Sequence, residues 1–179
     1  MTRPRRGLFL DRDGVLNERP PAHDYLRSSE QFRWLPGVPE AIARLSSAGF
    51  VPIVVSNQRG IARALVSWST LASIERVIQR GLSEYGGSIA AFYYCPHDIH
   101  EGCRCRKPAP GLLLRAAAEH RLDLGASAIV GDSETDVQAG RAAGCLSIQV
   151  AEPGEPSTAD VVVAGLPSAA DYLLDERRR

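Results

Sequence analysis

Short, continuously apolar segments alternate along this chain with segments of helical periodicity, and this alternation restricts the possible folds more than any other feature. Strands that are covered on both faces have such uninterrupted apolar runs, because neither face meets water. The runs predict strands over residues 7–10, 51–56, 90–95, 126–131, 146–150 and 160–163. Apolar residues three and four positions apart predict helices over residues 39–48, 70–85, 111–120, 134–143 and 168–175.

Strand–helix alternation of this kind predicts an α/β fold: a three-layer, Rossmann-like parallel sheet with helices on both faces and right-handed crossovers. The 179 residues, of which 44% are hydrophobic, suit a single domain spanning residues 1–179 with a full core. About 39 residues lie between Asn17 and Ser56, and they include a core helix, so no large cap domain is expected. In such sheets ligands bind beyond the carboxyl ends of the strands.

Charge and hydropathy exclude several classes of protein. The 21 basic residues equal the 21 acidic ones, and the resulting net charge of zero argues against a dedicated binder of nucleic acids or anionic membranes. No apolar run approaches the roughly 18 residues of a membrane span, and the apolar stretch after the basic N-terminus is too short for a signal peptide. We therefore expect a cytoplasmic protein without a nucleic-acid or membrane partner, and we take it to be a monomer.

Two carboxylates follow the first predicted strand directly, in the sequence Asp11-Arg12-Asp13-Gly14. Alternation along an extended chain points Asp11 and Asp13 to the same side, and Gly14 allows a sharp turn after them. Two carboxylates so close together repel each other, so a bound cation or a proton on one of them is expected. The alternative interpretation is an aspartate that caps the next segment.

Polar residues also follow two other predicted strands. Ser56, Asn57 and Gln58 end the second strand, where a hydroxyl and amides can donate to an anion, although an ordinary turn has the same composition. Asp132 stands at the tip of the fourth strand and fits a metal ligand, whereas Asp136 suits the negative charge that a helix start favours. Since these strands are predicted to be parallel, their polar ends share one edge of the sheet.

Lys107 is the single lysine in a chain with 20 arginines. Codon bias accounts for the general excess of arginine. A compact ammonium in such a background nevertheless indicates a role that a planar guanidinium cannot fill.

DRDG (11–14), Ser56, Lys107 and GDSETD (131–136), in this order and after the expected strands, resemble the haloacid dehalogenase superfamily of phosphatases. The resemblance implies that Asp11 attacks the phosphoryl group to form an aspartyl-phosphate, and that Asp13 acts as acid and then as base. It also implies a Mg²⁺ ion held by Asp11, the backbone carbonyl of Asp13 and Asp132. Ser56 and Lys107 would stabilise the phosphoryl oxygens.

Three cysteines and a histidine form a CxH…CxC pattern in a polar loop after the third predicted strand. Three thiolates and an imidazole make a closed tetrahedral Zn²⁺ site, which is structural because no coordination position is open to substrate. The predicted ligands are Cys95, His97, Cys103 and Cys105, with His100 as a competing imidazole. The alternative to a zinc site is that these cysteines are separate buried residues of the core. We interpret Cys145 in that way, as a buried core thiol. We expect the loop to aim Arg106 and Lys107 at the substrate.

This loop is similar to that of a zinc-containing subgroup, which includes D-glycero-D-manno-heptose 1,7-bisphosphate 7-phosphatases and histidinol-phosphate phosphatases. The segments NQRGIAR (57–63) and RKPAPGLLL (106–114) are typical of the heptose branch. The resemblance implies that the 7-phosphate of a small phosphorylated sugar is removed to give heptose 1-phosphate, for nucleotide-activated heptose synthesis such as that of lipopolysaccharide. The implied substrate-binding residues are Asp11, Asp13, Ser56, Asn57, Gln58, Arg59, Arg106 and Lys107.

Two rival functions remain open. One is histidinol-phosphate hydrolysis, and the other is a non-catalytic binding module stabilised by zinc, against which the complete carboxylate and lysine set argues. Residues 18–26 form a longer segment than the family pattern has, which leaves the preference for the α or β anomer open. In this segment His23 and Tyr25 contact either the substrate or the scaffold.

Overall fold

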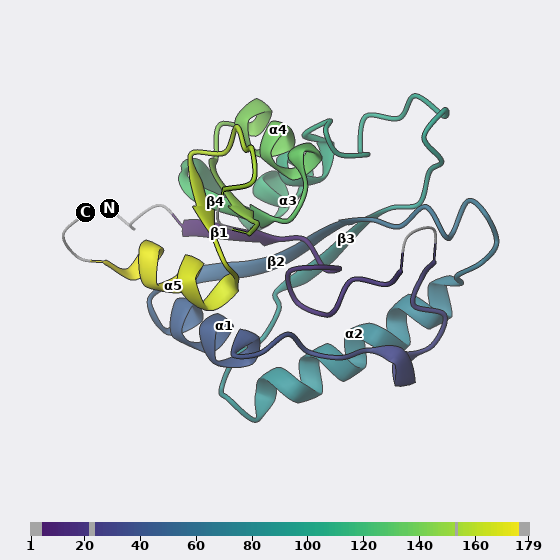
Figure 1. The fold of residues 1–179 in the computed structure, drawn as a ribbon, viewed down its shortest axis with the longest axis horizontal. Coiled ribbons are helices and arrows are strands. Elements are labelled where there is room, and N and C mark those ends of the chain that lie inside the picture. Colours follow the sequence, from purple (N-terminus) through teal and green to yellow (C-terminus); the bar gives the residue numbers. More distant parts are fainter. Residues whose placement is uncertain (1–4, 22–23, 153, 176–179) are drawn as a thin grey trace.

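The central strand of the sheet is β1 (Arg5–Leu10), which lies between β2 (Phe50–Asn57) and β4 (Leu122–Gly131). The computed structural model describes residues 5–21, 24–152 and 154–175. β3 (Ala91–Cys95) extends the sheet beyond β2, and β5 (Leu146–Val150) and β6 (Val161–Val163) extend it beyond β4. Neighbouring strands pair in parallel in the order β3-β2-β1-β4-β5-β6 (Figure 1). The predicted parallel α/β sheet is therefore confirmed.

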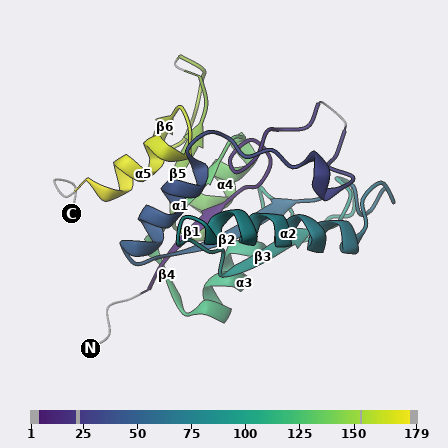
Figure 2. The ribbon, with the colours of Figure 1, turned by 90° about the horizontal axis from the view of Figure 1, so that it is seen from below.

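Helices cover both faces of the sheet and make it the middle of three layers. α1 (Val38–Ser47), α2 (Trp68–Ser83) and α5 (Leu166–Leu174) lie on one face, and α3 (Gly111–His120) and α4 (Glu134–Ala143) lie on the other (Figures 1 and 2). Successive side chains of a strand point to opposite faces. Leu8 and Leu10 of β1 accordingly pack with the first group of helices, and Phe9 packs with the second.

The predicted boundaries lie within two residues of the observed ones, with one exception: β4 begins four residues earlier than expected. Residues 122–126 alternate between half-buried and exposed, so this part of β4 lacks the continuous apolar run on which the prediction depended. Among the described residues between β1 and α1, the regular structure consists of one short 3₁₀ helix, η1 (Ser29–Gln31), which agrees with the expected lack of a large cap domain.

Loops that leave the carboxyl ends of the strands surround one edge of the sheet. They are residues 11–21 and 24–37 after β1, residues 58–67 after β2, residues 96–110 after β3 and the short junction from β4 into α4. β1 has β2 and β4 as its neighbours, so residues that directly follow these three strands meet at one place. None of the described helices is both long and apolar enough to cross a membrane.

Candidate active site

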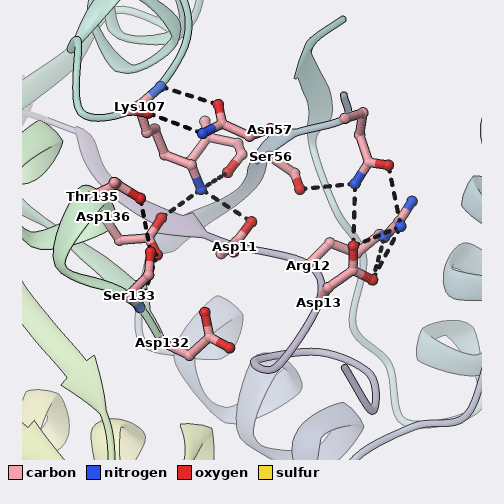
Figure 3. Close-up of polar contacts among 12 residues, drawn as sticks. Asp11, Arg12, Asp13, Ser56, Asn57, Lys107, Asp132, Ser133, Thr135 and Asp136 are labelled. Atoms are coloured by element: carbon pink, nitrogen blue, oxygen red, sulfur yellow. Dashed lines mark hydrogen bonds and ion pairs between the residues drawn. The ribbon is translucent and has the colours of Figure 1, made fainter. Parts of the chain in front are cut away.

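Lys107 lies at the centre of a buried group of charges at the carboxyl ends of β1, β2 and β4 (Figure 3). Its Nζ lies 3.0 Å from Asp11 Oδ1 and 2.5 Å from Asp136 Oδ1, and it donates to the carbonyl oxygen of Val55 at 2.8 Å. Burial acts to lower the pKa of Lys107, but the charges of Asp11 and Asp136 outweigh it, and the pKa is raised. The ammonium therefore carries its charge at neutral pH and holds it beside Asp11.

Asn57, at the end of β2, holds the backbone of Lys107 in place. The Asn57 side-chain amide donates to the Lys107 carbonyl oxygen at 3.0 Å, and the Lys107 N–H donates to Asn57 Oδ1 at 3.0 Å. This reciprocal pair ties the loop before α3 to the sheet (Figure 3). It occupies both groups of the Asn57 amide, and a direct contact between Asn57 and substrate stays a prediction.

The carboxylates of Asp11, Asp132 and Asp136 form a group that can hold a cation, because one oxygen of each lies within 4.8 Å of the others. Asp132 Oδ1 is buried and has no hydrogen-bond partner among the described residues, while Oδ2 pairs with Arg19. Burial and, after it, the charge of Asp11 raise the pKa of Asp132 to about 6. An unpartnered carboxylate oxygen beside further carboxylates fits a hard cation such as Mg²⁺, which prefers oxygen ligands.

Gly14 makes this approach of β1 and β4 possible. Its φ of 87° lies in the left-handed region that favours glycine. A Cβ atom at this position would overlap the carboxylate of Asp132. The turn that the sequence predicted after Asp13 therefore also provides the space in which Asp132 lies.

Asp136 belongs to the site as well as to the start of α4. Its Oδ2 accepts hydrogen bonds from the Ser133 N–H at 3.2 Å and the Ser133 hydroxyl at 2.5 Å, as a residue at a helix start does. Its Oδ1 contacts Lys107. The interpretation of Asp136 from the sequence, as a charge at a helix start, therefore describes one of its two roles. Its place in the GDSETD segment, four residues after the predicted metal ligand Asp132, is the sequence signal that could have found it.

The carboxylate of Asp13 is held by donors from three residues. Arg12 contacts both of its oxygens, Asn17 Nδ2 donates to Oδ1 at 2.9 Å, and Gln58 Nε2 donates to Oδ2 at 3.3 Å. Gln58 Nε2 also donates to Ser56 Oγ at 3.1 Å, which places the predicted residues Ser56 and Gln58 beside Asp13. Sequence reasoning missed Arg12 and Asn17, because a charged residue after a strand is expected to face solvent.

The four predicted zinc ligands come together at the end of β3 and in the loop that follows it. The three Sγ–Sγ distances among Cys95, Cys103 and Cys105 are 3.4, 3.5 and 3.6 Å, and His97 Nδ1 lies 3.2 Å from Cys105 Sγ. Ligands around a zinc ion with Zn–S bonds of about 2.3 Å stand about 3.8 Å apart, so the four atoms are spaced almost as a tetrahedral site requires. His97, and not His100, supplies the nitrogen.

Cys103 is the most readily ionised thiol of this cluster. Burial acts to raise its pKa, but the N–H groups of Arg106 and Cys105 and the neighbouring thiols lower it to about 7. Burial has the larger effect at Cys95 and raises the pKa of that thiol to about 12. Thiolates are the metal-binding form of cysteine, and Cys103 provides one near neutral pH.

The structure gives definite partners to the two predicted substrate-binding arginines. Arg59 Nε pairs with Asp98 Oδ1 at 2.7 Å and so joins the segment after β2 to the zinc-ligand loop. Arg106 Nη1 donates to the carbonyl oxygen of His97 at 3.3 Å and lines a cavity of about 280 Å³ next to Lys107. Their contacts with substrate stay predictions.

The other sequence-based interpretations concern residues around the site. The ring of Tyr25 packs on the scaffold at Gly60, where a Cβ would lie 3.0 Å from Tyr25 Cδ1. His23 lies outside the described residues. Cys145 is buried in the core beside α4, as predicted.

Known proteins are similar to this chain in sequence. The family model described as HAD-hyrolase-like matches residues 104–176. The D-glycero-beta-D-manno-heptose-1,7-bisphosphate 7-phosphatase of Bordetella bronchiseptica is 41% identical over 138 residues, which cover 77% of this chain and 76% of that protein. The D-glycero-alpha-D-manno-heptose-1,7-bisphosphate 7-phosphatase of Mycobacterium tuberculosis is 38% identical over 159 residues, or 86% of this chain and 83% of that protein.

Solved structures show the same fold. The crystal structure of D,D-heptose 1,7-bisphosphate phosphatase from B. bronchiseptica, complexed with magnesium and phosphate, superposes with a TM-score of 0.86. It is 36% identical in sequence, and the match covers 96% of this chain and 99% of that one.

A parallel sheet with aspartates and a buried lysine at one edge is the construction of haloacid dehalogenase-like phosphatases, and this chain is a phosphatase of that class. Within the class, it belongs to the family of heptose-1,7-bisphosphate 7-phosphatases. Both steps of the predicted resemblance, the superfamily and its heptose branch, are confirmed.

Proposed function

We propose that this protein removes the 7-phosphate of D-glycero-D-manno-heptose 1,7-bisphosphate and releases heptose 1-phosphate, through an aspartyl-phosphate on Asp11. The observation that carries this proposal is the position of Asp11, whose carboxylate lies 3.0 Å from the Lys107 ammonium and within 4.8 Å of the carboxylate oxygens of Asp132 and Asp136. Relatives named for each of the two anomers support a heptose bisphosphate and leave the anomer to be measured.

The first chemical step is a transfer of the phosphoryl group to Asp11. A carboxylate oxygen of Asp11 attacks phosphorus, and the bond from phosphorus to the sugar oxygen breaks with its electron pair on that oxygen. Asp13 gives its proton to the leaving oxygen. In the second step Asp13 takes a proton from water, whose oxygen attacks phosphorus and frees Asp11 and inorganic phosphate.

Lys107 acts in both steps by its charge. Its three N–H donors already have acceptors in Asp11, Asp136 and the Val55 carbonyl. Lys107 therefore orients the nucleophile and offsets the charge of the phosphoryl group, because its ammonium lies beside the attacking carboxylate in a site with little water. Ser56, which accepts from Gln58, has a hydroxyl proton left to donate to a phosphoryl oxygen.

Mg²⁺ is the cofactor that we propose for the carboxylate group, with Asp11, Asp132 and the backbone carbonyl of Asp13 as its protein ligands. The unpartnered Oδ1 of Asp132 supports this set, as does the magnesium ion in the B. bronchiseptica structure. When bound, such an ion neutralises phosphate charge and polarises a phosphoryl oxygen. Zn²⁺ is the ion that we propose for Cys95, His97, Cys103 and Cys105, where the near-tetrahedral spacing supports a structural role.

The remaining attributes follow from the small substrate and the balanced charge. We propose a single-domain, monomeric, cytoplasmic enzyme that acts on a small phosphorylated sugar and binds neither nucleic acid nor membranes. The cavity beside Arg106 supports recognition of the part of the sugar phosphate that does not react, since a guanidinium fork suits phosphate and sugar oxygens.

The experiment that tests the proposal is the replacement Asp11→Asn. It keeps the shape of the side chain but removes the nucleophile and one negative charge from the metal site, so phosphate release should fall to background. Release is measured from the α and β anomers of heptose 1,7-bisphosphate and from histidinol phosphate. Asp171→Asn, the same change on an exposed residue of α5, is the matched control and should retain full activity.

Two results would change this conclusion. Turnover by an Asp11→Asn protein that is folded and still binds Mg²⁺ would contradict the covalent mechanism. A wild-type preference for histidinol phosphate would replace the substrate and leave the phosphatase chemistry in place.

A further inference from the structure

Arg12 makes an unusual ion pair, because its partner is the next residue in the chain. Its Nη2 lies 2.8 Å from Asp13 Oδ2 and 3.0 Å from Asp13 Oδ1, and its Nε donates to Oδ1 at 3.1 Å. Consecutive side chains of an extended strand point to opposite sides, so this contact exists only because the chain turns after β1. Figure 3 shows the guanidinium directly against the carboxylate of Asp13, on the side away from Lys107.

A contribution to the stability of the fold does not explain why Arg12 is buried. Its side chain is 1% exposed, and Nη1 has no hydrogen-bond partner among the described residues. Taking a guanidinium out of water is costly, and a buried ion pair can often be replaced by apolar groups without loss of stability. A buried arginine with an unsatisfied nitrogen therefore indicates a role in the chemistry of the group that it holds.

The surroundings of Arg12 keep it in one orientation. Gln58 Oε1 accepts from Arg12 Nη2 at 3.4 Å, and Gln58 Nε2 donates to Asp13 Oδ2, so that the three side chains form a closed ring of contacts. Glu75 of α2 and Tyr94 of β3 lie close enough to interact electrostatically with the guanidinium. Arg12 thus has neighbours on several elements and little freedom to leave Asp13.

We propose that Arg12 is a positioning residue, which fixes the plane of the Asp13 carboxyl group so that its proton is aimed at the leaving oxygen. This inference rests on the proposed function, in which Asp13 is the general acid. As the bond from phosphorus to the leaving oxygen breaks, its electron pair stays on that oxygen, the Asp13 proton moves to the same oxygen, and Asp13 becomes a carboxylate that the guanidinium stabilises. Arg12 is buried and acts on the substrate only through Asp13.

This role predicts that replacing Arg12 lowers kcat/KM by an amount that depends on the leaving group of the substrate. A sugar alkoxide needs a proton to leave, whereas p-nitrophenolate leaves as a stable anion, and phenolate lies between them. In Arg12→Met, kcat/KM should fall about 100-fold or more for the sugar phosphate, less for phenyl phosphate, and under about 10-fold for p-nitrophenyl phosphate. kcat/KM reports the steps up to departure of the leaving group, and hydrolysis of the aspartyl-phosphate does not enter it.

The comparison within one protein preparation separates chemistry from folding. A ratio of kcat/KM values for two substrates does not depend on the folded fraction, so partial unfolding of Arg12→Met leaves it unchanged. If Arg12→Met yields no folded protein, Arg12→Gln takes its place. Arg44→Met, which breaks an exposed ion pair with Asp171, is the control and should keep the wild-type ratio.

Further variants distinguish the possible failures. Arg12→Lys keeps the charge but loses the two-nitrogen contact, so positioning predicts the same selective loss, whereas full recovery would overturn it. Equal losses on all three substrates would also overturn it.

Asp13→Asn should show the leaving-group dependence itself, and adding Arg12→Met should then change the ratio no further. If Asp13→Asn shows no such dependence, the general acid of the proposed function is wrong; if Asp13→Asn alone shows it, the inference about Arg12 is wrong.

Discussion

Single residues in this site have two tasks at once, and Asp136 is the clearest case. Through Ser133 it stabilises the start of α4, and through Lys107 it holds the cation of the site. Lys107 in turn depends on two carboxylates and one carbonyl group to stay charged in a buried place. The orientation of Asp11 is therefore set by a residue that follows a different strand.

Asp136→Asn tests this dependence. The amide keeps the shape and the helix-start contacts but removes the charge that holds Lys107, so we expect kcat to fall about 10-fold or more through misplacement of Lys107. The loss should persist at saturating Mg²⁺. Glu134→Gln removes a charge from the same helix turn without touching Lys107 and is the control. Full recovery of Asp136→Asn with excess Mg²⁺ would show that Asp136 acts through the metal instead.

At the scale of elements, the loop from β3 to α3 is held in place by contacts with the end of β2 and the segment that follows it. Arg59 pairs with Asp98, Asn57 binds the backbone of Lys107, and the Ala62 N–H donates to the Pro96 carbonyl oxygen at 3.1 Å. Three of the four residues of the Cys/His cluster lie in the same loop, whose residues 96–110 form neither helix nor strand, and the fourth, Cys95, ends β3. A loop without a core of its own gains rigidity from a bound metal ion.

Elemental analysis should find about one zinc ion per chain, and Cys103→Ser should lose most of it. Because Cys103 lies in the loop and outside the sheet, we expect this variant to raise KM several-fold, with a smaller effect on the free energy of unfolding than a core substitution has. Cys145→Ala removes a buried thiol outside the cluster and should leave the zinc content unchanged. Wild-type protein that contains no zinc after purification without chelator would contradict the zinc site.

At the scale of the whole molecule, the site forms only when the sheet is complete. Leu10 pairs with Val54 of β2 on one side and with Val130 of β4 on the other, so β1 brings distant parts of the chain into register. The ends of these strands and the residues directly after them carry Asp11, Ser56 and Asp132. Any change that loosens β1 therefore acts on stability and on the geometry of the site together.

Phe9→Ala tests the contribution of β1 to the core. Phe9 is fully buried against α3 and α4, and we expect the free energy of unfolding to fall by about 3–5 kcal/mol in urea titrations. Leu114→Ala, on an exposed position of α3, should change it by no more than about 0.5 kcal/mol. Similar losses in the two variants would contradict the two-sided core.

Periodicity and local motifs were sufficient for the fold class, the order of the elements and much of the candidate site. Uninterrupted apolar runs and helical spacing are properties of short segments, so they predicted the parallel sheet before any contact was known. Asp11 and Asp132 follow strand ends, and the CxH…CxC pattern spans only residues 95–105, so these residues could be selected as candidates from their neighbours in the chain. The first residues of β4 were not predicted, because half-exposed strand residues have no continuous apolar run.

The tertiary structure alone decided which side chains meet. The pairing of Lys107 with Asp136 and the brace from Asn57 join residues on different elements, and they depend on how the parallel strands lie beside one another. The contact of Arg12 with Asp13 depends on a turn and on the burial of a side chain that was expected in solvent, near Glu75 of α2 and Tyr94 of β3. Such contacts depend on register and on burial, and both arise only when segments far apart in the sequence pack together.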